Sequence, residues 1–126
     1  NEHILIVDDE PSIIRFSQLM LEGLGYRVTT RLSSVEALEL FKKRANRFDL
    51  VITDLTMPVM TGEALSREIK SLSPETPILM CTGFSQKVNH EKLRAIGVDG
   101  VILKPILKRD IAQKIRNILD SKKSSS

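Results

Sequence analysis

Cysteine, histidine and aromatic residues are scarce in this sequence of 126 residues. Cys81 is its single cysteine, so no disulfide can form within the chain, and a reducing compartment is expected. With two well-separated histidines, His3 and His90, the ligands for a structural zinc site are lacking. One tyrosine and no tryptophan supply few rings for stacking on bases, so we expect no direct contact with nucleic acid.

Long apolar runs are also missing. No stretch of about 18 apolar residues is present, and the N-terminus has no signal-peptide pattern, which predicts no membrane contact and a cytoplasmic location. The net charge is +3, but most basic residues stand among acidic ones, as in Arg67-Glu68. Short basic runs such as Lys42-Lys43-Arg44 fall where a helix is expected to begin or end. We interpret them as solvated helix surface and favourable charge at helix ends.

Apolar, β-rich runs alternate with segments of helical spacing along the whole chain. We expect strands near residues 4–7, 26–30, 50–54, 78–82 and 100–103. We expect helices near 11–24, 33–46, 62–72, 89–96 and 108–119. This alternation predicts an α/β fold with a parallel sheet, helices on both faces and right-handed crossovers.

The helix boundaries carry their own signals. Pro11 suits a first turn, Ser33 with Glu36 forms a capping box, and Gly97 suits a helix end. The polar residues 121–126 are expected to be a disordered tail after one domain over residues 1–120. The inward faces are expected to use Ile13, Ile14, Leu19, Met20 and Leu24 in the first helix, and Ala64, Leu65, Ile69 and Leu72 in the third.

Polar side chains follow four of the five expected strands. Asp8 and Asp9 follow the first, Asp54 ends the third, Thr82 ends the fourth and Lys104 follows the fifth. Strand ends of a doubly wound sheet meet at one edge, where ligands bind. Clustered carboxylates suit Mg²⁺, and a lysine serves as a point charge for phosphate. An aspartate in such a site can act as a nucleophile toward phosphorus and form an acyl phosphate.

Each of these residues also has an ordinary structural explanation. Asp54 alone is more often a cap or turn residue, and Asp8-Asp9 can simply begin a helix. Thr82 can be a strand-end turn residue, and Lys104 can be surface charge. Taken together these explanations are hard to sustain, because every polar group falls at the same topological edge.

Four short stretches of the sequence form a recognisable set. They are Ile6-Val7-Asp8-Asp9-Glu10-Pro11, Asp54-Leu55-Thr56-Met57-Pro58-Val59-Met60-Thr61-Gly62, Thr82-Gly83 and Lys104-Pro105. Each stretch alone is unspecific, but the set is highly specific. Through it the chain resembles, over essentially its whole length, a response-regulator receiver domain of two-component signalling, the CheY-like superfamily, which implies a flavodoxin-like sheet of order 2-1-3-4-5.

The resemblance implies a role for each site residue. Asp54 would be the phosphoacceptor, Asp9 and Asp54 would bind Mg²⁺ with the backbone carbonyl of Thr56, and Asp8 would act through a bound water. Lys104 would pair with Asp54 and then with the phosphoryl group, while Thr82 would be the switch hydroxyl. The peptide bond between Lys104 and Pro105 would be cis, which proline permits.

The resemblance also implies partners. A histidine kinase or a phosphotransfer protein would donate the phosphoryl group. The face formed by the fourth helix, fifth strand and fifth helix would switch an effector domain or a homodimer. The protein would be a signalling phosphoacceptor, able to lose its phosphoryl group unaided, and not a conventional enzyme. It would be a stand-alone or truncated response regulator or the receiver of a hybrid sensor kinase.

One position departs from the family pattern. Receivers usually carry Tyr or Phe three residues before the strand-five lysine, and here that position is Val101. The aromatic half of the usual switch is therefore missing, and the coupling is expected to be weaker or routed differently. Phe84, two residues after Thr82, is a candidate to shield the site in its place.

Three other interpretations of the function compete with that of a receiver domain. A phosphohydrolase with an aspartyl nucleophile usually has a second acid two residues after it, where this chain has Thr56. A nucleotide-binding module would need a glycine-rich phosphate loop, and no such pattern follows a strand. An interaction module that is never phosphorylated would not need the intact set of acids, threonine and lysine.

Overall fold

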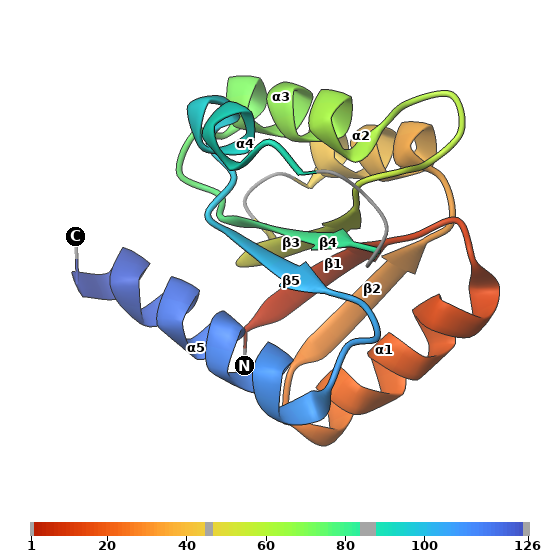
Figure 1. Cartoon of the computed structure of the whole chain (residues 1–126), viewed down its shortest axis with the longest axis vertical. Coiled ribbons are helices and arrows are strands. Elements are labelled where there is room, and N and C mark those ends of the chain that lie inside the picture. Colours follow the sequence, from red (N-terminus) through yellow and green to blue (C-terminus); the bar gives the residue numbers. More distant parts are fainter. Residues whose placement is uncertain (1, 45–46, 84–87, 125–126) are drawn as a thin grey trace.

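The fold is built on a parallel β-sheet, seen here in a computed structural model that describes residues 2–44, 47–83 and 88–124 (Figure 1). In these residues five strands run in the order β2-β1-β3-β4-β5, which confirms the predicted flavodoxin-like topology. The strands are β1 (His3–Val7), β2 (Arg27–Arg31), β3 (Leu50–Asp54), β4 (Ile78–Thr82) and β5 (Gly100–Leu103).

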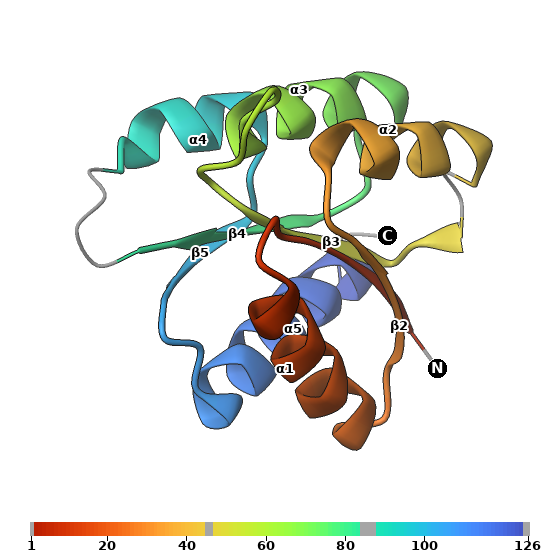
Figure 2. The same ribbon diagram turned by 90° about the vertical axis from the view of Figure 1, so that its right-hand side faces the viewer.

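Helices cover both faces of the sheet. Figure 2 shows α2, α3 and α4 on one face and α1 and α5 on the other. Each face has its own apolar core: one centres on Leu5, Phe41 and Met80, and the other on Ile4, Leu79 and Ile115. The helices are α1 (Pro11–Gly23), α2 (Ser34–Lys43), α3 (Gly62–Leu72), α4 (His90–Ile96) and α5 (Lys108–Ser124).

Side-chain caps begin three of the helices. The Ser33 hydroxyl accepts a hydrogen bond from the Glu36 N–H at 3.4 Å, as the capping motif predicts. Thr61 caps α3 in the same way, and Asn89 caps α4 at 3.0 Å from the Lys92 nitrogen. A cap of this kind is worth about 1 kcal/mol, so these contacts fix where each helix starts.

The strand register brings the predicted polar residues to one edge. Val7 of β1 lies opposite Thr53 of β3, so the residues that follow them emerge together. Asp54 in turn lies opposite Cys81 of β4, and Thr82 lies opposite Leu103 of β5. The strand ends that the sequence separates are therefore neighbours in space.

Two predicted buried faces need correction. Leu19 in α1 is 59% exposed, whereas Leu21 is fully buried, because α1 packs through Ile14, Ser17 and Leu21. The small polar Ser17 lies in the middle of this stripe, and an apolar pattern misses it. Leu72, predicted to face inward from α3, is 47% exposed in the last turn of that helix.

The C-terminal helix is longer than expected. It was predicted to end near Leu119 and to be followed by a disordered tail over 121–126, but α5 continues to Ser124. No glycine or proline follows Leu119 to stop the helix, so it continues through polar residues. Residues 125–126 lie outside the described chain. None of the described helices combines the length and apolar content that crossing a membrane requires.

Candidate functional site

Three carboxylates meet at the strand ends. Asp8 and Asp9 follow β1, Asp54 ends β3, and one oxygen from each lies within 4.8 Å of the others. Asp8 and Asp54 are buried, while Asp9 is exposed to solvent. An oxygen cluster that is partly open to water fits a hard divalent cation such as Mg²⁺, which keeps several of its own waters. The chain therefore supplies suitable ligands for the metal that the resemblance implies.

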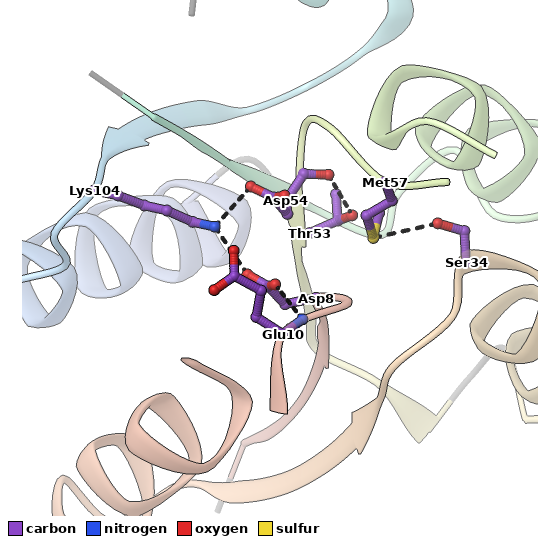
Figure 3. A network of polar contacts seen from close by, with 7 residues as sticks. All are labelled: Asp8, Glu10, Ser34, Thr53, Asp54, Met57 and Lys104. Carbon is purple, nitrogen blue, oxygen red and sulfur yellow. Dashed lines mark hydrogen bonds and ion pairs between the residues drawn. The ribbon is translucent and has the colours of Figure 1, made fainter. Parts of the chain in front are cut away.

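Lys104 lies against two of these acids, as Figure 3 shows. Its Nζ atom is 3.0 Å from Oδ2 of Asp8 and 2.9 Å from Oδ1 of Asp54. The other Asp8 oxygen accepts the Glu10 N–H at 3.0 Å, which fixes the Asp8 carboxylate. The sequence predicted the pair with Asp54 but missed the contact with Asp8. The peptide bond between Lys104 and Pro105 is cis.

For both Asp54 and Lys104, burial and the contact between the two residues shift the pKa in opposite directions. Burial raises the pKa of Asp54, and the nearby Asp8 and Asp9 add to the increase, while Lys104 lowers it without fully compensating. Burial lowers the pKa of Lys104, but hydrogen bonds to Asp54 and Asp8 outweigh this, and the net pKa is raised. The cluster thus has three acids and one ammonium, which contacts Asp8 and Asp54. The resulting negative potential favours an added cation.

Thr82 places a buried hydroxyl group beside the acidic site. Its side chain is fully buried at the end of β4, and its Oγ1 has no hydrogen-bond partner among the described residues. Leaving a buried polar group unpaired costs about 1–3 kcal/mol. Its backbone oxygen accepts the Lys104 N–H at 2.8 Å, which ties it to the neighbouring strand end. The hydroxyl can therefore donate to a new acceptor at little cost in existing bonds.

The β3–α3 connection is packed closely against the acid at its start. The Gly62 N–H donates to the Leu55 oxygen at 2.9 Å, and a Cβ atom at Gly62 would overlap the backbone oxygen of Asp54. Glycine is thus required by close approach of two backbones. Thr56, whose carbonyl is predicted to bind the metal, lies in this connection with an exposed side chain. Its role stays a prediction.

The same connection contains a strained turn. The Met60 N–H donates to the Pro58 oxygen at 2.7 Å, which closes a three-residue γ-turn around Val59. Val59 has a φ angle of +69° and is 98% exposed. A positive φ is unfavourable for a β-branched residue, and no burial compensates for it.

Sequence reasoning missed two polar contacts that hold the connection. The Thr53 hydroxyl donates to the Asp54 backbone oxygen at 3.1 Å, and the Ser34 hydroxyl donates to the Met57 sulfur at 3.4 Å (Figure 3). Met57 is almost fully buried, so it anchors the connection beside α2. The apolar Met57 among turn residues is the signal that could have indicated such an anchor.

The switch position carries a small side chain. Val101 lies opposite Met80 in the sheet and is half-buried against the core beneath α2, α3 and α4. No ring is available there to change its exposure. Phe84, the candidate shield, lies outside the described residues.

The lone thiol adjoins the site without entering its chemistry. Cys81 lies opposite Asp54 in the sheet and is 3% exposed. Burial raises its pKa to about 12, so the sulfur stays protonated near neutral pH. A protonated, buried thiol is a poor nucleophile.

Comparison with known proteins identifies the family. Residues 4–116 match the model of the response regulator receiver domain. The chain is 32% identical over 117 residues to response regulator SaeR of Staphylococcus aureus (strain USA300), covering 93% of this chain and 50% of SaeR. It is 35% identical over 117 residues to the probable transcriptional regulator ycf27 of Cyanidium caldarium, covering 93% of this chain and 46% of that protein.

Solved structures agree with the sequence matches. A response regulator receiver domain protein from Clostridium thermocellum has a TM-score of 0.94 at 32% identity, covering 100% of both chains. Chemotaxis protein CheY4 of Vibrio cholerae has a TM-score of 0.85 at 31% identity, covering 94% of this chain and 98% of that one.

The chain belongs to the response regulator receiver domain family of two-component signalling. Receiver domains are signalling modules and not conventional enzymes, and they interact with histidine kinases or phosphotransfer proteins. The chain spans about half the length of the curated relatives it matches.

Proposed function

We propose that this chain receives a phosphoryl group on Asp54 from the phosphohistidine of a histidine kinase or phosphotransfer protein. The observation that carries the proposal is the meeting of Asp8, Asp9, Asp54 and Lys104 at one end of the sheet. An Asp54 oxygen attacks phosphorus as the bond from phosphorus to the histidine nitrogen breaks, and the nitrogen retains that electron pair. The other ring nitrogen of the phosphohistidine carries a proton, so the leaving group is a neutral histidine, and the other product is the acyl phosphate of Asp54.

The site residues have separate tasks in this proposal. Asp8, Asp9 and Asp54 would hold Mg²⁺, with the Thr56 carbonyl as a further ligand. When bound, the metal would offset the negative charge of the phosphoryl oxygens. Lys104 turns from the carboxylates to a phosphoryl oxygen as a point charge. Positioning provides most of the rate gain in such a transfer.

Phosphorylation would then change the nearby surface. The phosphoryl group adds acceptor oxygens and negative charge beside Thr82, whose unpaired hydroxyl can donate to one of them. Because Thr82 ends β4, its movement would bias the face formed by α4, β5 and α5. Leu103 on β5 is 56% exposed on this face. We propose that this face reports phosphorylation to an effector domain or to a second copy of the chain.

The phosphodonor protein would dock beside the acids. An apolar groove of about 390 Å³ lies between α1 and the segment after β5, lined by Ile13, Phe16, Pro105 and Ile106. Lys104 borders both this groove and the acidic site, so the two are continuous. Phe16 is 59% exposed there. We propose that an apolar helix of the donor protein fills the groove and places its phosphohistidine over Asp54, in the cytoplasm.

A chemical donor tests the central proposal without a kinase. The chain is incubated with acetyl phosphate and Mg²⁺, and the covalent gain of a phosphoryl group is measured by intact mass. Wild type is expected to be labelled, Asp54→Asn is not, and the exposed control Asp49→Asn is labelled like wild type. Persistent labelling of Asp54→Asn would remove Asp54 from its role. Omission of Mg²⁺ is expected to slow labelling at least tenfold.

The docking groove is tested by comparing two donors. Phe16→Asp places a charge in the groove and is expected to leave labelling by acetyl phosphate within twofold of wild type. Transfer from a phosphorylated histidine kinase or phosphotransfer protein active on wild type should slow at least tenfold. Equal transfer to both proteins would exclude the groove as the docking site.

A further inference from the structure

Apart from the acidic site, the described residues form a second cleft, which is lined by arginines. It lies between the edge strand β2 and the C-terminal half of α2, with a volume of about 550 Å³. Four arginines border it: Arg27, Arg31, Arg44 and Arg47. The chain has nine arginines and ten lysines; four of the nine arginines line the cleft, and no lysine is among its lining residues in the part of the chain that the structure describes.

The fold explains why distant arginines converge. Successive side chains of a strand alternate between faces, so Arg27, Thr29 and Arg31 share the face of β2 that α2 covers. Arg44 is the C-cap residue of α2, and Arg47 precedes the buried Phe48. The strand and the helix end thus line one space with arginines, of which Arg31 donates from Nη1 to the Thr30 backbone oxygen at 2.7 Å.

Little negative charge balances this group. Among the described residues that line the cleft, Asp49 is the one acid, and its carboxylate accepts the His3 N–H at 2.8 Å. Across the described ranges 2–44, 47–83 and 88–124, none of the four arginines lies within ion-pair distance of a carboxylate. Four positive charges gathered around one carboxylate leave a net positive charge, which attracts an anion.

The pKa of a neighbouring histidine reflects the same field. His3 lies at the end of the cleft, where its Nε2 is 2.7 Å from Oγ1 of Thr29. Its pKa is lowered, first by burial and then by the charge of Arg27; Asp49 and a backbone hydrogen bond with Arg47 raise it, and Arg44 adds a smaller lowering effect. The positive charge of the cleft thus acts on a group at its wall.

We infer that this cleft binds a small anion carrying two or more phosphate groups. Guanidinium groups match phosphate oxygens in pairs of parallel hydrogen bonds, which a lysine ammonium cannot provide. The volume suits a small molecule. Phe48, the aromatic residue other than His3 that lines the cleft, is 6% exposed and cannot stack on a base, which disfavours nucleic acid.

The cleft and the acidic site are separate but connected. Arg31 lies opposite Val7 in the sheet, and its backbone oxygen accepts the Asp8 N–H at 3.2 Å. Binding in the cleft needs none of the carboxylates at the strand ends. Anion binding in the cleft is therefore expected whether or not Asp54 accepts a phosphoryl group.

Calorimetry with inorganic triphosphate in metal-free, low-salt buffer tests this site on the whole chain. Wild type is expected to bind one triphosphate per chain. The double variant Arg27→Gln/Arg44→Gln should weaken this binding at least tenfold. A matched control, Arg67→Gln/Arg94→Gln, removes the same charge from exposed positions on α3 and α4 and should stay within twofold of wild type. Circular dichroism checks that every variant is folded.

The outcomes separate the alternatives. No saturable binding to wild type, or equal weakening in both double variants, would overturn the site. Loss of binding in Asp54→Asn would place the triphosphate at the acidic site and also overturn it. Tighter binding of hexaglutamate or of a short DNA duplex than of triphosphate would overturn the ligand class. Binding of adenosine triphosphate at the same affinity as triphosphate supports recognition through phosphates alone.

Discussion

The Nζ atom of Lys104 lies 2.9 Å from Oδ1 of Asp54, so a cation from β5 meets the acid that ends β3. The contact crosses β4, which separates these two strands in the sheet. Lys104 also reaches Asp8 and so holds the ends of β1, β3 and β5 together. One side chain therefore links the three parts of the chain that form the acidic site.

Replacing Lys104 should slow phosphorylation and raise the pKa of Asp54. In Lys104→Gln the carboxylates lose the charge that lowers the pKa of Asp54, while burial and the other acids still raise it. We expect labelling by acetyl phosphate to slow at least tenfold, which corresponds to about 1.4 kcal/mol or more in the barrier. Lys92→Gln, which breaks a surface ion pair with Glu63, is the matched control. Equal labelling rates in both variants would contradict the role of Lys104.

The stability of the metal-free protein should depend on Asp54 in a specific pH interval. Burial raises the folded-state pKa of Asp54 above its unfolded value, so the folded chain binds this proton more readily. Between the two pKa values, the contribution of Asp54 to the free energy of unfolding falls as pH rises. An asparagine carries no charge at any of these pH values, so this fall in the free energy of unfolding is absent in Asp54→Asn. The variant should therefore be more stable than wild type at neutral pH by about 1 kcal/mol.

The check is urea unfolding at several pH values. The advantage of Asp54→Asn should shrink as pH falls through the interval and disappear below the unfolded-state pKa, where both chains carry a neutral side chain. Glu39→Gln, at an exposed position on α2, serves as the control. An advantage that stays constant at all pH values would show that its origin is not the charge of Asp54.

Relieving the turn at Val59 should stabilise the fold. Asparagine tolerates a positive φ better than valine, and this side chain makes little contact to lose because it is 98% exposed. We expect Val59→Asn to raise the free energy of unfolding by about 1 kcal/mol, measured from the urea midpoint. Val35→Asn, on the exposed side of α2, controls for the change in polarity. A lower midpoint for Val59→Asn than for wild type would contradict the strain.

Adding a methyl group at Gly62 should damage both stability and the site. The new Cβ atom would overlap the Asp54 backbone oxygen, and the neighbouring atoms are also backbone and the Met80 sulfur, which leave little room to yield. We expect Gly62→Ala to cost about 2 kcal/mol or more. Gly23→Ala, where nothing lies within 4 Å, is the matched control and should not be destabilised. Thermal unfolding and acetyl phosphate labelling measure the two effects, and a variant as stable as wild type would refute the close packing.

The sequence predicts the acidic site well because strand ends are marked twice. An apolar run shows where each strand lies, and a polar residue such as Asp54 shows where it stops. Because the strands are parallel, the ends that these polar residues mark all lie at one edge of the sheet, where they form the site. Distances and second contacts are not encoded in this pattern, so the bond from Lys104 to Asp8 could not be predicted.

Features that depend on packing between elements escape such reasoning. Ser17 is buried in α1 because it lies on the same helix face as Ile14 and Leu21, and an apolar pattern does not include a serine. Of the arginines that line the cleft, Arg44 is interpreted from the sequence as solvated helix surface, whereas Arg27, Arg31 and Arg47 carry no prediction of a function. The spacing of two residues in Arg27, Thr29 and Arg31 was a signal that they share one face of a strand.

Cys81 gives the chain a practical property. Its thiol is buried and protonated beside Asp54, so electrophilic reagents, which react with thiolates, would not modify it in the folded protein. A cysteine introduced at an exposed position would then be the one thiol that reacts. A dye attached on α4 or α5 could follow the arrival of the phosphoryl group in real time, with the native cysteine left in place.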